Sequence, residues 1–178
     1  GEVQQLLNMG DPEVDQQRYM QVIENKTAKL FEAACRLGAI ISGQPANIEN
    51  ALAIYGNRLG SAFQIADDVL DYTGDAETMG KNAGDDLAEG KPTLPLIHTM
   101  KHGTEEQRQL IRQAIRKGGL DDLEPIREAV IASGAIDYTF SQAQLQIEQA
   151  MQQLTLIPKS AFRDILEHLP QLAVNRRT

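Results

Sequence analysis

Residues 47–72 constrain the fold most, because their pattern predicts one long helix. The apolar residues recur at helical spacing and should form a stripe that faces a core. They are Leu52, Tyr55, Leu59, Phe63, Ala66 and Leu70. Gly56 and Gly60 lie within this stretch, where a glycine destabilises a helix by about 1 kcal/mol relative to alanine. Close approach of another helix or of a ligand would explain both glycines.

The rest of the chain also predicts helices. Aromatic residues make up 4% of the 178 residues, and no long stretch alternates polar and apolar residues with period two. We expect further helices over residues 1–8, from Asp11-Pro12 to about Ile41, from Pro92 through about Met100, and near 105–117, 123–133, 138–156 and 160–169. The prediction is an all-α, single-domain fold, with active-site helices in residues 1–100 and packing helices in 101–178.

Composition and charge restrict the classes of function. Seventeen basic and twenty-five acidic residues give a net charge of -8, and the absence of a basic stripe argues against a nucleic-acid partner. The single cysteine, Cys35, argues against disulfides. The sequence has no apolar run as long as a membrane span, and its start does not resemble a signal peptide. We therefore expect a cytoplasmic protein.

Carboxylates gather where the long predicted helix ends. Gln64, Asp67 and Asp71 share one helix face, and Asp68 lies beside them. Like charges at this spacing destabilise a helix by a few tenths of a kcal/mol. We therefore expect a bound cation to offset the repulsion between these carboxylates. Oxygen ligands without His or Cys indicate a hard ion, Mg²⁺ before others. The alternative is a solvated helix end that is simply acidic.

Lysines follow the carboxylates in a Gly-rich segment over residues 73–90. Lys81 and Lys91 each follow a glycine. Carboxylates that bind Mg²⁺, with lysines nearby, suit a diphosphate, because the metal and the ammonium groups share its charge. Asp86 could pair with either lysine or reach a metal through water. The lysines could equally be ordinary loop charges, and periodicity alone puts Lys26 at the surface.

Three segments together resemble the trans-isoprenyl diphosphate synthases. They are Lys26-Thr27-Ala28, then Phe63-Gln64-Ile65-Ala66-Asp67-Asp68-Val69-Leu70-Asp71, then Gly80-Lys81 with Gly84, Asp86 and Gly90-Lys91-Pro92-Thr93-Leu94-Pro95. The resemblance extends from Gly1 at least through Met100. Within this family, the sequence is most similar to the bacterial long-chain branch, the octaprenyl diphosphate synthases that make quinone side chains.

The resemblance implies a helical bundle in which two Asp-rich helices face each other and Mg²⁺ ions bridge them to an allylic diphosphate. It implies that Asp67 is the principal metal ligand, supported by Asp68 and Asp71. It further implies that the allylic diphosphate is held by Lys26, Lys81 and Lys91, and that Thr27 and Gln64 line the reacting centre. The implied reaction condenses isopentenyl diphosphate onto an allylic diphosphate such as farnesyl diphosphate. A homodimer is expected on the same ground.

The sequence departs from the family pattern in one respect. The first Asp-rich motif, DDxxxxD followed by paired arginines, and the cationic residues for isopentenyl diphosphate are not found in the 178 residues. We therefore expect the C-terminal portion of a synthase, with half of a metal site and no turnover by itself. The alternative is a non-catalytic accessory subunit of a heteromeric synthase, although such subunits typically have degraded Asp motifs.

Overall fold

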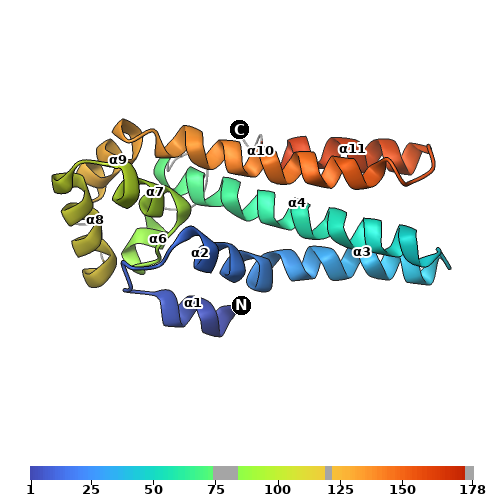
Figure 1. Cartoon of the computed structure of the whole chain (residues 1–178), viewed down its shortest axis with the longest axis horizontal. Helices are drawn as coiled ribbons and strands as arrows, with labels where there is room; N and C mark the ends of the chain where they lie inside the picture. Colours follow the sequence, from blue (N-terminus) through green and yellow to red (C-terminus); the bar gives the residue numbers. More distant parts are fainter. Residues whose placement is uncertain (74–83, 119–121, 175–178) are drawn as a thin grey trace. The chain divides into compact units, whose positions relative to one another are not determined.

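The computed structural model describes residues 1–73, 84–118 and 122–174, and the regular secondary structure in these ranges is helical (Figure 1). The elements are α1 (Glu2–Asn8), α2 (Gln16–Ile23), the π-helical turn η1 (Glu24–Ala28), α3 (Lys29–Ile41), α4 (Ala46–Thr73), α6 (Asp85–Ala88), α7 (Leu94–His102), α8 (Glu105–Lys117), α9 (Leu123–Ala132), α10 (Ala135–Leu154) and α11 (Ala161–Val174). This confirms the all-α prediction. Within the described ranges, every helix is too short or too polar to cross a membrane.

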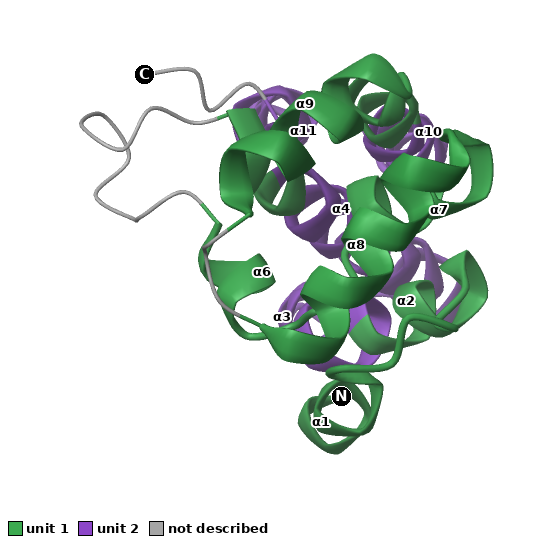
Figure 2. Ribbon diagram, turned by 90° about the vertical axis from the view of Figure 1, so that its left-hand side faces the viewer, with its two compact units in different colours: residues 1–22, 67–141, 178 green, residues 23–66, 142–177 purple. Residues whose placement is uncertain are grey.

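The chain forms two compact units that interleave along the sequence (Figure 2). Among the described residues, unit 1 contains 1–22, 67–73, 84–118 and 122–141, and unit 2 contains 23–66 and 142–174. Helices α4 and α10 each contribute to both units. The predicted division of the chain near residue 100 stays a prediction.

Unit 1 is built around α7, α8 and α9. Its core contains Tyr72, Leu87, Leu96, Ile111, Ala114, Ile115, Ile126, Val130 and Ala135. Helix α8 begins where predicted because Thr104 and Gln107 form a capping box. Two hydrogen bonds fix the end of α4: the hydroxyls of Tyr72 and Thr93 lie 3.0 Å apart, and Arg127 Nε donates to the Tyr72 carbonyl at 2.9 Å. This core therefore holds the carboxylate-bearing turn of α4 in place.

Unit 2 packs α3 and η1 against α4 through the two glycines. A Cβ atom added to Gly60 would lie 2.7 Å from Ala28 Cα, and one added to Gly56 would lie 2.9 Å from Cys35 Sγ. Side chains of ordinary size therefore cannot occupy these positions without moving a backbone. Of the two explanations for these glycines, the structure supports the close approach of a helix.

The helix predicted from Asp11-Pro12 begins later than expected, at Gln16. Asp11 Oδ1 accepts the Glu13 N–H at 2.9 Å and forms a local turn instead. Asp15 Oδ1 accepts the Arg18 N–H at 2.8 Å, the bond typical of a capping residue. The predicted single helix is also interrupted by η1, for which the sequence gives no signal. Such π-helical turns are frequent at functional sites.

Helix α11 continues through Pro170 to Val174, although the proline was expected to end it near Leu169. A proline has no N–H for the carbonyl four residues earlier, which here is the Leu166 carbonyl. The Tyr55 hydroxyl donates to that carbonyl at 2.7 Å. The helix therefore tolerates the proline because α4 supplies the missing donor.

We expect opposite effects from alanine at two helical glycines of unit 2. Gly60→Ala should destabilise the chain by about 1–3 kcal/mol, because the new methyl group overlaps the η1 backbone. Gly38→Ala should stabilise it by up to about 1 kcal/mol, since a Cβ there meets no atom within 4 Å. Urea unfolding followed by circular dichroism measures both. Equal effects of the two variants would contradict the packing described here.

Removal of the Tyr55 hydroxyl should destabilise the chain by about 1–2 kcal/mol, because the Leu166 carbonyl would lose its donor. Pro170→Ala restores an N–H that can bond that carbonyl. Tyr55→Phe should therefore have a smaller effect in the Pro170→Ala background, and a double-mutant cycle of unfolding free energies tests this. Additive effects would show that the hydroxyl does not replace the missing donor.

Candidate metal and diphosphate site

Asp68 lies buried in unit 1, where Tyr19 of α2 binds it. Asp68 is 3% exposed and Tyr19 is 5% exposed. The Tyr19 hydroxyl donates to Asp68 Oδ2 at 2.7 Å. Burial raises the pKa of the Tyr19 hydroxyl, and the nearby Asp68 raises it further, so the hydroxyl remains a donor. Tyr19 was not predicted at the site, because a tyrosine in an amphipathic helix gives no signal for such a role.

Asp71 lies one turn further along α4 and has one satisfied oxygen. Its Oδ1 accepts the Gly84 N–H at 3.1 Å, whereas its Oδ2 is buried and has no hydrogen-bond partner in the described part of the chain. Burial raises the pKa of this carboxyl from 3.8 to about 6, and repulsion by Asp86 adds to the shift. Burial and the neighbouring carboxylate thus both disfavour the ionised form of Asp71.

Lys91 is held by two carboxylates in unit 1. Its Nζ donates to Asp86 Oδ1 at 2.8 Å and lies 2.9 Å from Glu89 Oε2. Burial by itself would lower the pKa of Lys91, but the hydrogen bonds to Asp86 and Glu89 raise it overall. Of the alternatives for Asp86, the structure shows the pairing with Lys91. Gly90 closes the turn with φ of +67°, and a Cβ there would lie 2.6 Å from the Ile115 carbonyl oxygen.

The carboxylates at the end of α4 fit a hard cation in their chemistry. Their donors are oxygens, and Asp71 Oδ2 lacks a partner. In the described ranges, however, no three side chains of His, Cys, Asp or Glu are placed to hold a metal ion by themselves. Asp67, Asp68 and Asp71 therefore suit an ion whose coordination is completed by oxygens of other groups, such as a phosphate or water.

Unit 2 brings together two of the predicted substrate-binding residues. Thr27 Oγ1 donates to Gln64 Oε1 at 2.9 Å, which joins η1 to α4. Lys26 stands beside Thr27 in the same π-helical turn and is exposed, as its periodicity suggested. Lys81 lies outside the described residues. The sequence separation of 37 between Thr27 and Gln64 shows why spacing alone could not pair them.

The raised pKa of Asp71 predicts a pH-dependent stability. Above about pH 6 the ionised carboxylate disfavours the folded state, and this destabilisation is lost as the pH falls from about 6 toward the ordinary value of 3.8. Asp71→Asn keeps the acceptor for Gly84 and removes the charge. It should raise the melting temperature of the metal-free chain by about 2–4 °C at pH 7.5 and leave it unchanged near pH 4.

Calorimetry with EDTA measures this difference, and Asp137→Asn, an exposed change on α10, serves as the control. Adding Mg²⁺ at pH 7.5 should raise the melting temperature of the unmodified chain more than that of Asp71→Asn. A metal-free Asp71→Asn chain that is less stable than the unmodified chain at pH 7.5 would refute the assignment of excess negative charge.

Comparison with known proteins finds one family throughout. The profile of the family described as Polyprenyl synthetase matches residues 1–131. The chain is 48% identical to octaprenyl diphosphate synthase of Escherichia coli (strain K12), covering 99% of this chain and 55% of that protein. The chain is 47% identical to the all-trans-nonaprenyl-diphosphate synthase (geranyl-diphosphate specific) of Rhodobacter capsulatus. This match covers 99% of this chain and 54% of that protein.

A solved structure agrees with these relatives. The polyprenyl synthase of Caulobacter crescentus CB15, complexed with calcium and isoprenyl diphosphate, superposes with a TM-score of 0.93 at 41% identity, covering 99% of this chain and 55% of that one. The chain thus spans about half the length of the relatives it matches. Together, the family profile, the intact Asp-rich turn and the superposition place this chain in the polyprenyl synthetase family.

Proposed function

We propose that the native protein carrying this chain is a long-chain trans-prenyl diphosphate synthase. It would condense isopentenyl diphosphate onto an allylic diphosphate such as farnesyl diphosphate, and octaprenyl diphosphate for quinone side chains is the product we expect. The observation that carries this proposal is the carboxylate-rich end of α4, where Asp71 Oδ2 is buried without a hydrogen-bond partner in the ranges that the structure describes. Family membership and relatives named as octaprenyl and nonaprenyl diphosphate synthases support it.

Asp67, Asp68 and Asp71 would hold Mg²⁺, with Asp67 as the principal ligand. The bound metal supplies positive charge for the diphosphate that leaves the allylic substrate. Tyr19 serves as a positioning residue, because its hydroxyl donates to Asp68 Oδ2 and fixes this carboxylate. A cation would also bind Asp71 Oδ2, which is buried and has no hydrogen-bond partner among the described residues.

Lysines would bind the phosphate oxygens directly. We assign Lys26, Lys81 and Lys91 to the allylic diphosphate, whose departure requires preorganised positive charge in a dry site. Asp86 holds the Lys91 ammonium group in one place, which lowers the entropy that Lys91 must lose when the substrate binds. Thr27 Oγ1 fixes the Gln64 amide through its donation to Gln64 Oε1, and the oxygens of this pair would stabilise the positive charge that develops on the allylic carbons.

The accessory-subunit alternative is less well supported. Subunits of that kind typically lack an intact second Asp motif, whereas Asp67, Asp68 and Asp71 are all present. We also propose that the native protein is a cytoplasmic homodimer, on the family resemblance. Sedimentation of the native protein tests the oligomeric state.

Incorporation of labelled isopentenyl diphosphate tests the proposed reaction. We expect the native protein to extend farnesyl diphosphate in the presence of Mg²⁺ and to stop when EDTA is added. Chromatography of the dephosphorylated products gives the chain length. A protein that binds both diphosphates but forms no new carbon–carbon bond would favour the accessory role.

Loss of the principal metal ligand should abolish most of the activity. In the native protein, Asp67→Ala should lower kcat/KM about 10³-fold, several kcal/mol of transition-state stabilisation. Steady-state kinetics at saturating Mg²⁺ measure this change. Asp137→Ala, an exposed change on α10 outside the proposed site, is the matched control. Near-normal turnover of Asp67→Ala would refute its assignment as a metal ligand.

A further inference from the structure

Unit 1 contains a hollow of about 480 Å³ that includes none of the residues assigned above. Four segments line it: residues 12–17, α7, the first half of α8, and Tyr138 of α10. Its size lies within the range of about 300–1,000 Å³ that is usual for small-molecule sites. Buried apolar residues such as Val14, Leu94 and Ile97 contribute to its wall.

Cationic side chains outnumber carboxylates in the lining of this hollow, whereas acidic residues predominate in the whole chain. Lysine and arginine side chains contribute Lys101, Arg108 and Arg112, and His98 and His102 add two imidazoles. The carboxylates in the described lining are Glu13 and Asp15, and Asp15 already accepts a backbone N–H at the start of α2. Three cationic side chains and two imidazoles thus line one concave surface of a chain whose net charge is -8, although Arg108 is already paired with Glu105 at 2.6 Å.

Arg112 is a cation of the hollow that an anion could reach by displacing an exposed partner. Its Nη1 donates to Glu13 Oε1 at 2.5 Å, and the Glu13 side chain is 66% exposed. An exposed ion pair of this kind contributes at most about 1 kcal/mol, so an anion can displace Glu13. Arg112 Nε is buried and has no hydrogen-bond partner in the described part of the chain. An oxyanion in the hollow would bind the guanidinium through the Nη1 group that Glu13 now occupies.

Stacked rings form one side of the hollow. His98 stacks on Tyr138 with 4.2 Å between ring centroids, and His102 lies 4.4 Å from His98. The Tyr138 hydroxyl donates to Gln16 Oε1 at 2.6 Å, which fixes the stack. Burial lowers the pKa of His98, and repulsion by His102 and Lys101 lowers it further. A bound anion would oppose this repulsion.

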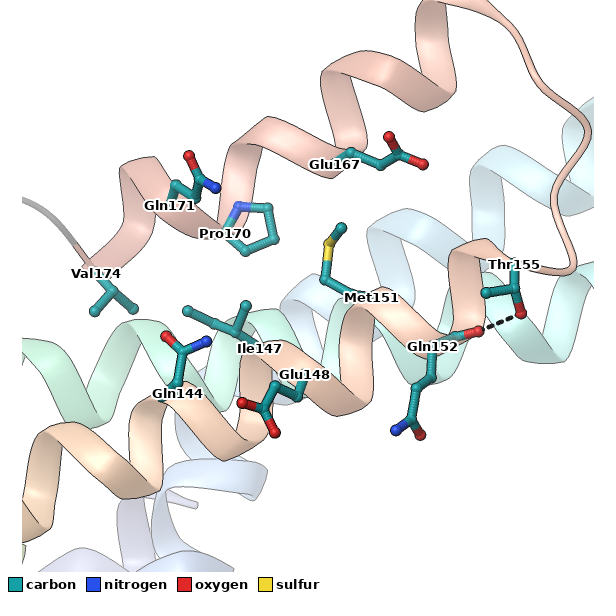
Figure 3. A pocket seen from close by; sticks show the side chains of 10 residues that line it. All are labelled: Gln144, Ile147, Glu148, Met151, Gln152, Thr155, Glu167, Pro170, Gln171 and Val174. Atoms are coloured by element: carbon teal, nitrogen blue, oxygen red, sulfur yellow. Dashed lines mark hydrogen bonds between the residues drawn. The ribbon is translucent and has the colours of Figure 1, made fainter.

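A second concave surface provides a contrast. A groove of about 740 Å³ in unit 2 runs between α10 and α11, and its lining side chains include Ile147, Met151, Pro170 and Val174 (Figure 3). Its described polar lining consists of glutamine, glutamate and threonine, without a cationic side chain. Charge therefore distinguishes the two surfaces, and the hollow of unit 1 is the one suited to an anion.

We propose that the hollow lined by Arg112, Lys101 and the two histidines is a second anion site that binds a phosphate group. The probe is orthophosphate in the presence of EDTA, so that no metal-dependent binding contributes. This inference does not depend on the proposed synthase activity, because the binding is measured without substrates or turnover.

The histidine side chains report where phosphate binds. The chain has three, of which His98 and His102 line the hollow and His168 lies on α11. Imidazole nitrogen resonances of the labelled chain are followed as phosphate is added against chloride of equal ionic strength. We expect saturable shifts of His98 and His102, an increased pKa of His98, and no shift of His168. Shifts that do not saturate, or that affect the three histidines equally, would overturn the proposal.

Two variants of α8 test the assignment of the cation. Arg112→Gln should weaken phosphate binding at least about 10-fold. Arg116→Gln, an exposed change one turn further along the same helix and outside the lining, should leave the binding unchanged. Equal effects of the two variants would contradict the proposal. If Arg112→Gln does not fold, as judged by circular dichroism, the exposed Lys101→Gln takes its place, with the same outcomes.

A further variant separates the two anion sites. Lys91→Gln alters the proposed diphosphate site and should leave the histidine shifts intact. Loss of those shifts in Lys91→Gln, with binding retained in Arg112→Gln, would place the phosphate at the diphosphate site and refute a second one.

Discussion

The concentration of negative charge at the end of α4 is the constraint on which the proposed site depends. Asp67, Asp68 and Asp71 lie in the last two turns of a helix that ends at Thr73. Backbone carbonyls give a helix C-terminus a partial negative charge of about half an elementary charge, so these carboxylates stand where anions are least favoured. Burial of Asp68 and of Asp71 Oδ2 increases the electrostatic repulsion.

The surrounding structure holds this unfavourable turn in place. Tyr72 is fully buried in the core of unit 1, its hydroxyl lies 3.0 Å from that of Thr93, and its carbonyl accepts from Arg127. Tyr19 and Gly84 bind individual carboxylate oxygens. These contacts fix the backbone of the turn and individual carboxylate oxygens of Asp68 and Asp71. A cation would therefore bind a site that needs little reorganisation, which is the arrangement expected for electrostatic catalysis.

A hydrogen bond also replaces a missing partner elsewhere in the fold, where Tyr55 supplies the donor that Pro170 lacks. This bond joins segments 111 residues apart. A helical pattern cannot relate such segments to each other, because it specifies a face and not its neighbour. Leu30 and Ile41 of α3 make the same point: both are apolar by pattern, yet they are 75% and 84% exposed.

The sequence by itself determined the helices, the Asp-rich turn and the family, because helical periodicity, caps and the spacing of Asp67, Asp68 and Asp71 are local properties. The sequence predicted the bounds of α8, and Gly56 and Gly60 indicated a close approach. Only the tertiary structure decided which groups meet. The pairing of Tyr19 with Asp68, of Thr27 with Gln64, and the π-helical turn at Lys26 depend on contacts between distant segments. Such contacts leave no periodic trace in a single sequence, since each arises from packing and burial rather than from local propensity.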